Sequence, residues 1–139
     1  MERRVFIKKG CVACMGLVGT SLLLESCSSS LPLVKTNPEN KSLSVPLNNF
    51  SVNNNLVIVR SGSLENDILL IKNQNEYKAL YLRCTHEGVG LTATDKKIVC
   101  SAHGSVFDFQ GNVVKEPALK PLQQFQTEVN NENVIIHLI

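Results

Sequence analysis

Two short segments of this chain each combine a cysteine with a histidine, and they constrain the fold more than any other feature. The first is Cys84-Thr85-His86 and the second is Cys100-Ser101-Ala102-His103. Each follows an apolar run that predicts a strand, and a glycine stands shortly after each histidine, which favours a sharp turn. Two thiolates and two imidazoles form a ligand set for a soft metal centre. The fold must therefore place the two loops side by side.

The body of the chain, residues 43–139, has the pattern of short strands separated by turns. Apolar or alternating runs lie at residues 56–60, 67–72, 77–83, 97–100, 106–109, 125–129 and 134–138. Asn and Gly mark turns between them, and no stretch of ten residues in the body has the period of a helix. Trp is absent and aromatic residues make up only 5% of the chain, so the core depends on Val, Ile and Leu, which favour strands. We therefore expect an all-β fold, a small antiparallel β-sandwich or barrel.

The first 26 residues have the layout of an export signal. Residues 1–9 are rich in charge, and residues 10–24 are uncharged and mostly apolar or small. The run from Arg3 to Lys8 resembles a twin-arginine signal, which serves an export path for proteins that fold before they cross the membrane. We therefore expect residues 1–26 to act as a signal and the rest to face the extracytoplasmic side of a bacterial membrane.

Residues 22–27 resemble a lipobox, in which the signal is cut before a cysteine that then carries lipid. Glu25 departs from this pattern, since a small or apolar residue normally stands there. We expect lipidation of Cys27, with an uncleaved membrane anchor and ordinary cleavage as alternatives. Residues 27–42 are rich in Ser, Pro, Asn and Lys, so we expect them to form a flexible polar tether.

The charge balance and the remaining cysteines exclude two other classes of protein. Without residues 1–26 the chain has ten basic and ten acidic residues, which gives no basic stripe for a nucleic acid. Only Cys84 and Cys100 lie in the body, too few for a disulfide framework. Cys11 and Cys14 are best read as small apolar residues of the signal.

Two alternative readings of the Cys/His pairs follow from the residues themselves. A structural zinc site usually pairs cysteine with cysteine at a spacing of two to four residues, whereas each pair here mixes Cys with His. A Cys-His nucleophile would leave the second pair unexplained. A mixed Cys/His metal centre accounts for both pairs.

At these residues the sequence resembles the Rieske iron–sulfur family, whose pattern is C-x-H followed by C-x-x-H. The resemblance runs from about Lys78 to Leu122 and includes residues 104–108 and a proline-rich third segment that begins at Pro117. It implies three stacked antiparallel sheets with the cluster loops at one tip, and one 2Fe-2S cluster. It also implies that Cys84 and Cys100 bind the buried iron, and that His86 and His103 bind the outer one.

The chain departs from the quinol-oxidising members of this family at three positions. Val89 and Ala102 stand where those members have a disulfide between the loops, and Phe107 replaces a tyrosine whose hydroxyl bonds a ligand sulfur. Ser105, the other usual donor to the cluster, is present. Hydrogen bonds to sulfur raise the potential of such centres, which span roughly −150 to +300 mV. We therefore expect a potential in the lower part of this range.

The function implied is one-electron transfer outside the cytoplasm, between a quinol- or dehydrogenase-linked partner and a cytochrome or other oxidoreductase. A small electron-transfer subunit of a larger enzyme, such as an arsenite-type oxidase, is an alternative. A structural metal-binding domain without a redox role is an alternative of another class. We see no substrate-converting site, because the one further histidine, His137, lies in an apolar strand pattern and cannot supply the second iron site of an oxygenase.

Overall fold

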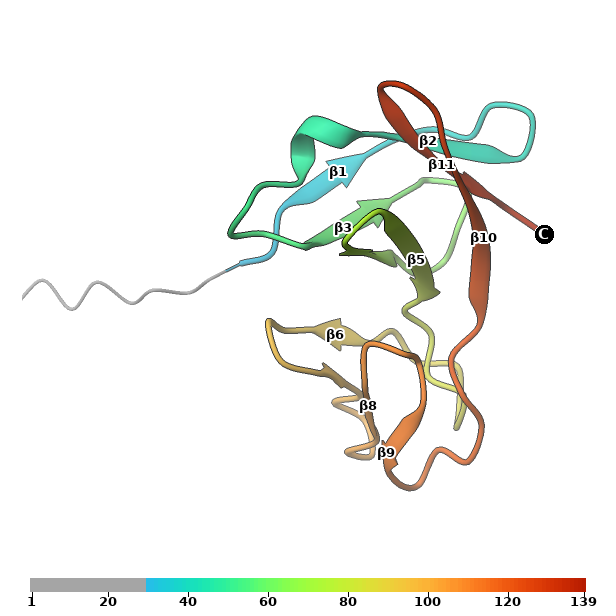
Figure 1. Cartoon of the computed structure of the whole chain (residues 1–139). Helices are drawn as coiled ribbons and strands as arrows, with labels where there is room; N and C mark the ends of the chain where they lie inside the picture. Colours follow the sequence, from blue (N-terminus) through green and yellow to red (C-terminus); the bar gives the residue numbers. More distant parts are fainter. Residues whose placement is uncertain (1–29) are drawn as a thin grey trace, which may run out of the picture.

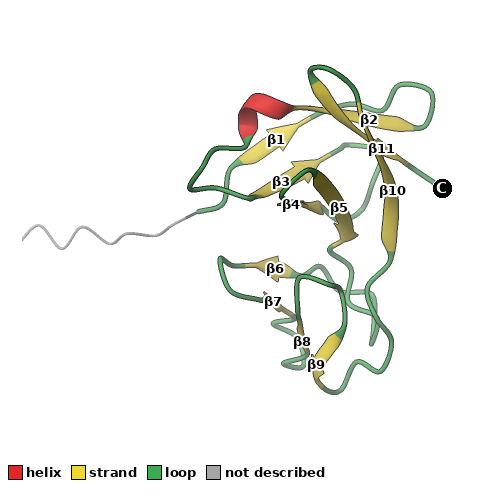
Figure 2. Cartoon of the chain, viewed as in Figure 1, coloured by secondary structure: helices red, strands yellow, loops and turns green. Residues whose placement is uncertain are grey.

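The computed structural model describes residues 30–139, which form strands and a single turn of 3-10 helix (Figure 1, Figure 2). The predictions for the export signal, for Cys11 and Cys14 and for lipidation of Cys27 lie outside the described residues. The elements are β1 (Leu33–Lys35), β2 (Ser42–Pro46), η1 (Leu47–Asn49), β3 (Leu56–Arg60), β4 (Ile68–Asn73), β5 (Glu76–Tyr81), β6 (Thr92–Ala93), β7 (Ile98–Val99), β8 (Val106–Phe107), β9 (Val113–Lys115), β10 (Gln124–Val129) and β11 (Asn133–His137). The expected all-β fold is confirmed.

The larger sheet has seven strands in the order β1-β3-β4-β5-β10-β11-β2. All neighbours in it are antiparallel except β1, which runs parallel to β3. β10 belongs to two arms of this sheet, because Gln124 and Phe125 pair with β5 and residues 126–129 pair with β11. The sheet thus folds over itself, and side chains from both arms enclose one core. With the smaller sheet, the two arms correspond to the three sheets expected from the sequence.

A second core lies between the larger sheet and the smaller one. Successive side chains of β4 point to opposite faces, as strand geometry requires. Ile68 and Leu70 therefore enter the first core, while Leu69 enters the second. All three are fully buried. β4 is thus covered on both faces and links the two halves of the molecule.

The smaller sheet, β6-β7-β8-β9, has strands of only two or three residues and forms the lower body in Figure 1. Three loops belong to this half. The first loop, residues 82–91, joins β5 to β6; the second loop, residues 100–105, joins β7 to β8; the third loop, residues 116–123, joins β9 to β10. The four Cys and His residues singled out from the sequence lie in the first and second loops.

The expectation of a flexible tether over residues 27–42 is wrong for β1. This strand is part of the larger sheet: the Ile58 amide donates to the Pro32 carbonyl at 2.8 Å, and the Thr36 amide donates to the Arg60 carbonyl at 3.0 Å. Val34 packs against the first core. Leu31 packs against the second core. Backbone pairing with β3 and these two apolar side chains hold the segment, although its composition is polar.

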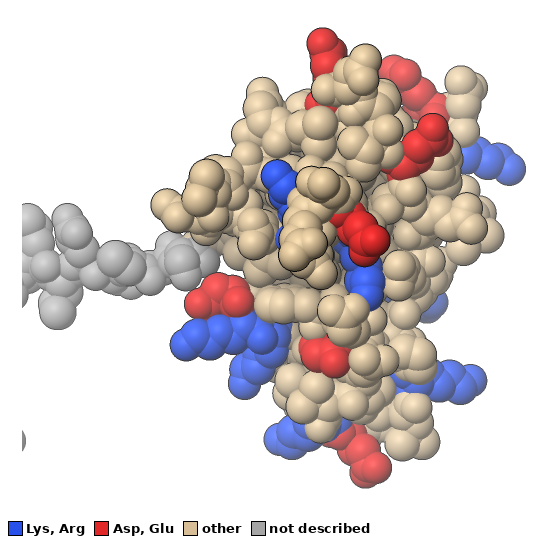
Figure 3. All heavy atoms as spheres, viewed as in Figure 1, with Lys and Arg blue, Asp and Glu red and all other residues tan. Residues whose placement is uncertain are grey.

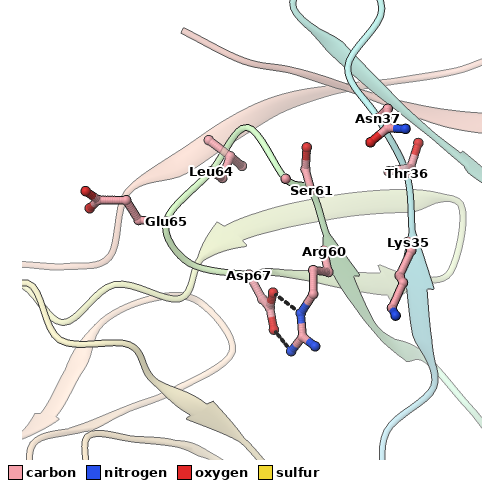
Figure 4. Close-up of a pocket in the computed structure, with 9 residues that line it drawn as sticks. Lys35, Thr36, Asn37, Arg60, Ser61, Leu64, Glu65 and Asp67 are labelled. Atoms are coloured by element: carbon pink, nitrogen blue, oxygen red, sulfur yellow. Dashed lines mark hydrogen bonds and ion pairs between the residues drawn. The ribbon is translucent and has the colours of Figure 1, made fainter.

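A pocket lies beside the junction of β1 and β3, where the chain turns from β3 towards β4 (Figure 4). Two hydrogen bonds, of 2.9 and 2.7 Å, join the Arg60 guanidinium to the two carboxylate oxygens of Asp67. The hydrogen bond and the charge of Asp67 raise the pKa of Arg60. Both ends of this seven-residue connection are thereby joined.

Lysines and arginines are interspersed with acidic residues on the face drawn in Figure 3, in line with the balanced charge of the body. Within residues 30–139, no helix has the length and apolar character needed to cross a membrane.

Candidate metal centre

The first loop places Cys84 in a closed turn. The Gly88 amide donates to the Cys84 carbonyl at 2.8 Å, and the Cys84 amide donates to the Val89 carbonyl at 2.7 Å. Gly88 has a φ of 76°, a left-handed conformation that favours glycine. A side chain there would also meet the Arg83 guanidinium at 2.9 Å. Glycine at this position therefore allows the turn to close.

The second loop repeats the same turn. The Gly104 amide donates to the Cys100 carbonyl at 3.0 Å, the Cys100 amide donates to the Ser105 carbonyl at 2.9 Å, and Gly104 has a φ of 80°. Each glycine stands four residues after its cysteine, although the histidines stand two residues after Cys84 and three after Cys100. The constant spacing of four residues from cysteine to glycine thus determines the turn. Both cysteines consequently occupy the same position in their turns.

The two cysteines lie together in the interior. Cys84 is 2% exposed and Cys100 is 1% exposed, and both belong to the second core. Both are free thiols. Burial raises the pKa of Cys100, but hydrogen bonds from the Ala102 and His103 amides and from the Cys84 thiol outweigh burial, so the pKa lies below its usual value. Amide N–H groups thus favour a thiolate at Cys100, the form that binds metal.

The two histidines lie together at the surface. The His86 and His103 ring centroids are 4.9 Å apart, with the rings almost perpendicular. Both residues are exposed. The loops thus bring two imidazoles to the outside and two thiols to the inside of one tip.

The third loop is hydrogen-bonded to the other two. The Ala118 amide donates to the Ser105 hydroxyl at 3.0 Å, and the Thr85 hydroxyl donates to the Lys120 carbonyl at 2.6 Å. Ser105 is completely buried, and its hydroxyl keeps its own proton to donate. Pro117, which follows a cis peptide bond, lies in this loop next to Ala118.

The positions that distinguish the chain from quinol-oxidising relatives also lie around this tip. Val89 and Ala102 are both exposed. Phe107 is completely buried in the same core as Cys84 and Cys100 and carries no hydroxyl. His137 lies outside the three loops, in β11, where its Nδ1 is 3.2 Å from the Ser42 hydroxyl.

Comparison with known proteins identifies the family. Residues 45–126 match the model of the Rieske 2Fe-2S domain. The chain belongs to this family. Rieske domains bind a single 2Fe-2S cluster, so the cofactor expected from the sequence is confirmed at the level of the family.

The chain is similar in sequence to a curated Rieske subunit. It is 24% identical over 74 residues to the cytochrome b6-f complex iron-sulfur subunit of Chlorobaculum thiosulfatiphilum; the match covers 52% of this chain and 41% of that protein. The chain thus matches less than half the length of this curated relative.

Two solved structures show the same Rieske fold. The plasma membrane Rieske protein PetC3 of Synechocystis PCC 6803 aligns with a TM-score of 0.50 and 24% identity, over 59% of this chain and 85% of that one. The ferredoxin of carbazole 1,9a-dioxygenase from Nocardioides aromaticivorans IC177 aligns with a TM-score of 0.50 and 16% identity, over 79% of this chain and all of that one.

The residues at the tip fit a Rieske cluster. Mixed ligation by two cysteines and two histidines is the donor set of such a centre. The two thiols are buried in the same core, and the imidazoles form a separate exposed pair. The site therefore offers its sulfur donors and its nitrogen donors as two separate pairs.

Glu87 is a residue at this Rieske tip that the sequence did not single out. Its carboxylate lies 3.7 Å from Nδ1 of His103, and one donor atom each of His86, Glu87 and His103 lie within 4.8 Å of one another. The feature of the sequence that could have indicated Glu87 is its place between a candidate ligand, His86, and the glycine of the turn, Gly88.

Proposed function

We propose that this chain carries single electrons through one 2Fe-2S cluster held by Cys84, His86, Cys100 and His103. The observation that supports this most directly is the repeated turn, which sets two thiols inside the tip and two imidazoles outside it. When bound, a Rieske cluster takes up and releases one electron at a time, at a potential set by its ligands and their hydrogen bonds.

The proposed roles of these residues differ with their burial. Cys84 and Cys100 hold the inner iron, where the second core keeps water away. His86 and His103 hold the outer iron at the surface, where a partner can approach their ring edges. Ser105 accepts a hydrogen bond from the Ala118 amide, which joins the second loop to the third, and its hydroxyl would donate its own proton towards a bound cluster.

The test is spectroscopy of the full chain after purification without oxygen. The dithionite-reduced protein should give an electron paramagnetic resonance signal with the low average g value of mixed Cys/His ligation. Cys84→Ala and His103→Ala should each remove the signal. His137→Ala is the matched control, because His137 lies in β11 outside the cluster loops, and it should keep the signal. Bound zinc with no such signal would contradict the proposal and favour a structural metal site.

We also propose that residues 1–26 export the chain and that Cys27 carries lipid on the extracytoplasmic side. The support comes from the sequence and from the position of β1, which begins six residues after Cys27. Six residues span at most about 20 Å, so a lipid on Cys27 would hold the domain close to the membrane surface. Cys27→Ser should abolish incorporation of labelled fatty acid, and incorporation that persists in this variant would contradict lipidation.

The partner we propose is another redox protein, a quinol-linked complex, a cytochrome or the large subunit of an oxidoreductase. One similar protein belongs to a cytochrome b6-f complex and another is the ferredoxin of a dioxygenase. Affinity purification of the full chain from detergent-solubilised membranes tests this. Copurification of a quinol-linked complex would support the first possibility, and copurification of a catalytic large subunit would support the alternative role as a small enzyme subunit.

A further inference from the structure

Within the described residues, Glu87 carries the one carboxylate that is paired with a proposed histidine ligand. Its Oε2 is 3.7 Å from Nδ1 of His103, although Glu87 belongs to the first loop and His103 to the second. The two side chains are 57% and 44% exposed, respectively. The acidic group thus lies at the surface of the tip, between the two loops.

The turn of the first loop holds Glu87 in this place. Its neighbour Gly88 is fixed by the hydrogen bond to the Cys84 carbonyl, and its other neighbour is His86. Within residues 30–139, no lysine or arginine forms an ion pair with Glu87. Arg83 belongs to the same loop but is not paired with it. Its negative charge is therefore not neutralised by a neighbouring cation.

We propose that Glu87 lowers the reduction potential of the cluster through its negative charge. This inference builds on the function proposed above. Two ferric ions, two sulfides and two thiolates sum to zero charge, and one added electron makes the centre negative. A carboxylate beside two of the ligands repels that added charge and so disfavours the reduced state.

The position of Glu87 brings its charge close to both proposed histidine ligands. Its carboxylate belongs to the first loop but lies against His103 of the second loop, and one donor atom each of His86, Glu87 and His103 lie within 4.8 Å of one another. At this distance the repulsion acts against an electron added at the centre. Glu87 therefore makes the reduction potential more negative. A partner that reduces the centre transfers its electron against this repulsion.

The experiment compares midpoint potentials of the full chain by protein-film voltammetry at low ionic strength. Glu87→Gln removes the charge and nearly preserves the shape, and its midpoint should be more positive than that of the wild-type protein. Glu87→Asp keeps the charge and should stay closer to wild type. Glu132→Gln is the matched control, because it removes the same charge in the exposed turn between β10 and β11, and it should leave the midpoint unchanged.

Ionic strength provides a second readout that a change in packing would not produce. Salt screens charges at the surface, so the difference between wild type and Glu87→Gln should shrink as salt is added. Glu87→Ser is a second neutral variant for use if the first does not retain the cluster. An intact cluster signal with a wild-type midpoint in both neutral variants would overturn the inference, and so would an equal shift in Glu87→Asp. A wild-type protein with no cluster signal would instead contradict the proposed function.

Discussion

At the scale of single residues, Phe107 shows how an apolar side chain can set a property of the site. It is completely buried and shares a core with both cysteines. The ring fills space without offering a hydrogen bond, whereas a tyrosine in its place would add a hydroxyl to the core that contains both cysteines. Hydrogen bonds to sulfur stabilise the more negative, reduced state and raise the potential.

Phe107→Tyr should therefore raise the midpoint potential. A hydrogen bond with a net value of about 1 kcal/mol corresponds to roughly 40 mV for one electron. Protein-film voltammetry measures this shift, and thermal unfolding checks that the added hydroxyl is accommodated. Tyr81→Phe, which removes a hydroxyl from a side chain of the first core, is the control. An unchanged or lower midpoint in a stably folded Phe107→Tyr protein would contradict this role.

The residues of the tip differ in how far the sequence could predict them. The positions of Cys84 and Cys100 followed from the motif, and the glycine four residues after each cysteine was part of the same pattern. Glu87 did not stand out, because an acidic residue in a turn is usually solvated. Its contact with His103 depends on how the two loops meet, which spacing along the chain does not specify.

At the scale of elements, the third loop joins the first two through hydrogen bonds, in a chain that has no disulfide between them. Thr85 in the first loop bonds the Lys120 carbonyl, and Ser105 at the end of the second loop accepts the Ala118 amide. Both bonds link a side chain of a proposed ligand loop to the backbone of the third loop. The third loop therefore acts as a clamp across the tip.

Thr85→Val should loosen this clamp. Valine has nearly the shape of threonine but cannot donate to the Lys120 carbonyl, and a single hydrogen bond contributes about 0.5–1.5 kcal/mol. We expect a Tm lower by about 2–6 °C and faster loss of the visible cluster absorbance on warming. Thr92→Val, at an exposed position of β6, should change neither. Equal rates of cluster loss in the two variants would argue against the clamp.

β1 is held by backbone pairing and by one inward side chain. Val34 packs against the first core, whereas its neighbour Leu33 is exposed. Val34→Asp should detach the strand and cost about 1 kcal/mol or more of folding free energy, because a charge replaces a partly buried apolar group. Leu33→Asp is the control and should cost less. Urea unfolding measures the stability of both variants. Equal unfolding midpoints for Val34→Asp and Leu33→Asp would contradict the anchoring role of Val34.

The sequence indicated the long strands better than the short ones. The run at residues 56–60 coincides with β3, and the expected strands near β4, β5, β10 and β11 lie within two residues of their observed ends. β1, β2, β6 and β9 were not predicted. β1 lies in a polar stretch and pairs in parallel with a strand more than twenty residues away, and β6 has two residues. Such elements form through long-range pairing rather than local pattern.

At the scale of the whole molecule, the pairing order explains why the cluster half can form on such short strands. β4 is buried on both faces, so the larger sheet forms one side of the second core. The smaller sheet and the loops form the other side. The sequence predicted a sandwich but not this order, because β10 and β11 return to the larger sheet only after the chain has built the smaller one. The loops of the tip are thus supported by a core that includes β4 of the larger sheet.

That tip also exposes an apolar side chain next to the proposed route of the electron. Leu119, in the third loop, is 79% exposed and lies beside Lys120, whose carbonyl bonds the first loop. An exposed apolar side chain near the electron exit is suited to contact a redox partner. Leu119→Asp should therefore slow electron transfer to a partner while leaving the cluster signal intact.

Stopped-flow oxidation by a purified c-type cytochrome provides the measurement. We expect the second-order rate of Leu119→Asp to fall by about tenfold, as for the loss of about 1.4 kcal/mol of docking energy. Val52→Asp adds the same charge at a 99% exposed position between β2 and β3, in the half of the molecule without the cluster loops, so it separates a local effect from a change in net charge. If both variants slow the reaction equally, net charge governs the encounter and the tip is not the docking face. A loss confined to Leu119→Asp would place the docking face at the tip.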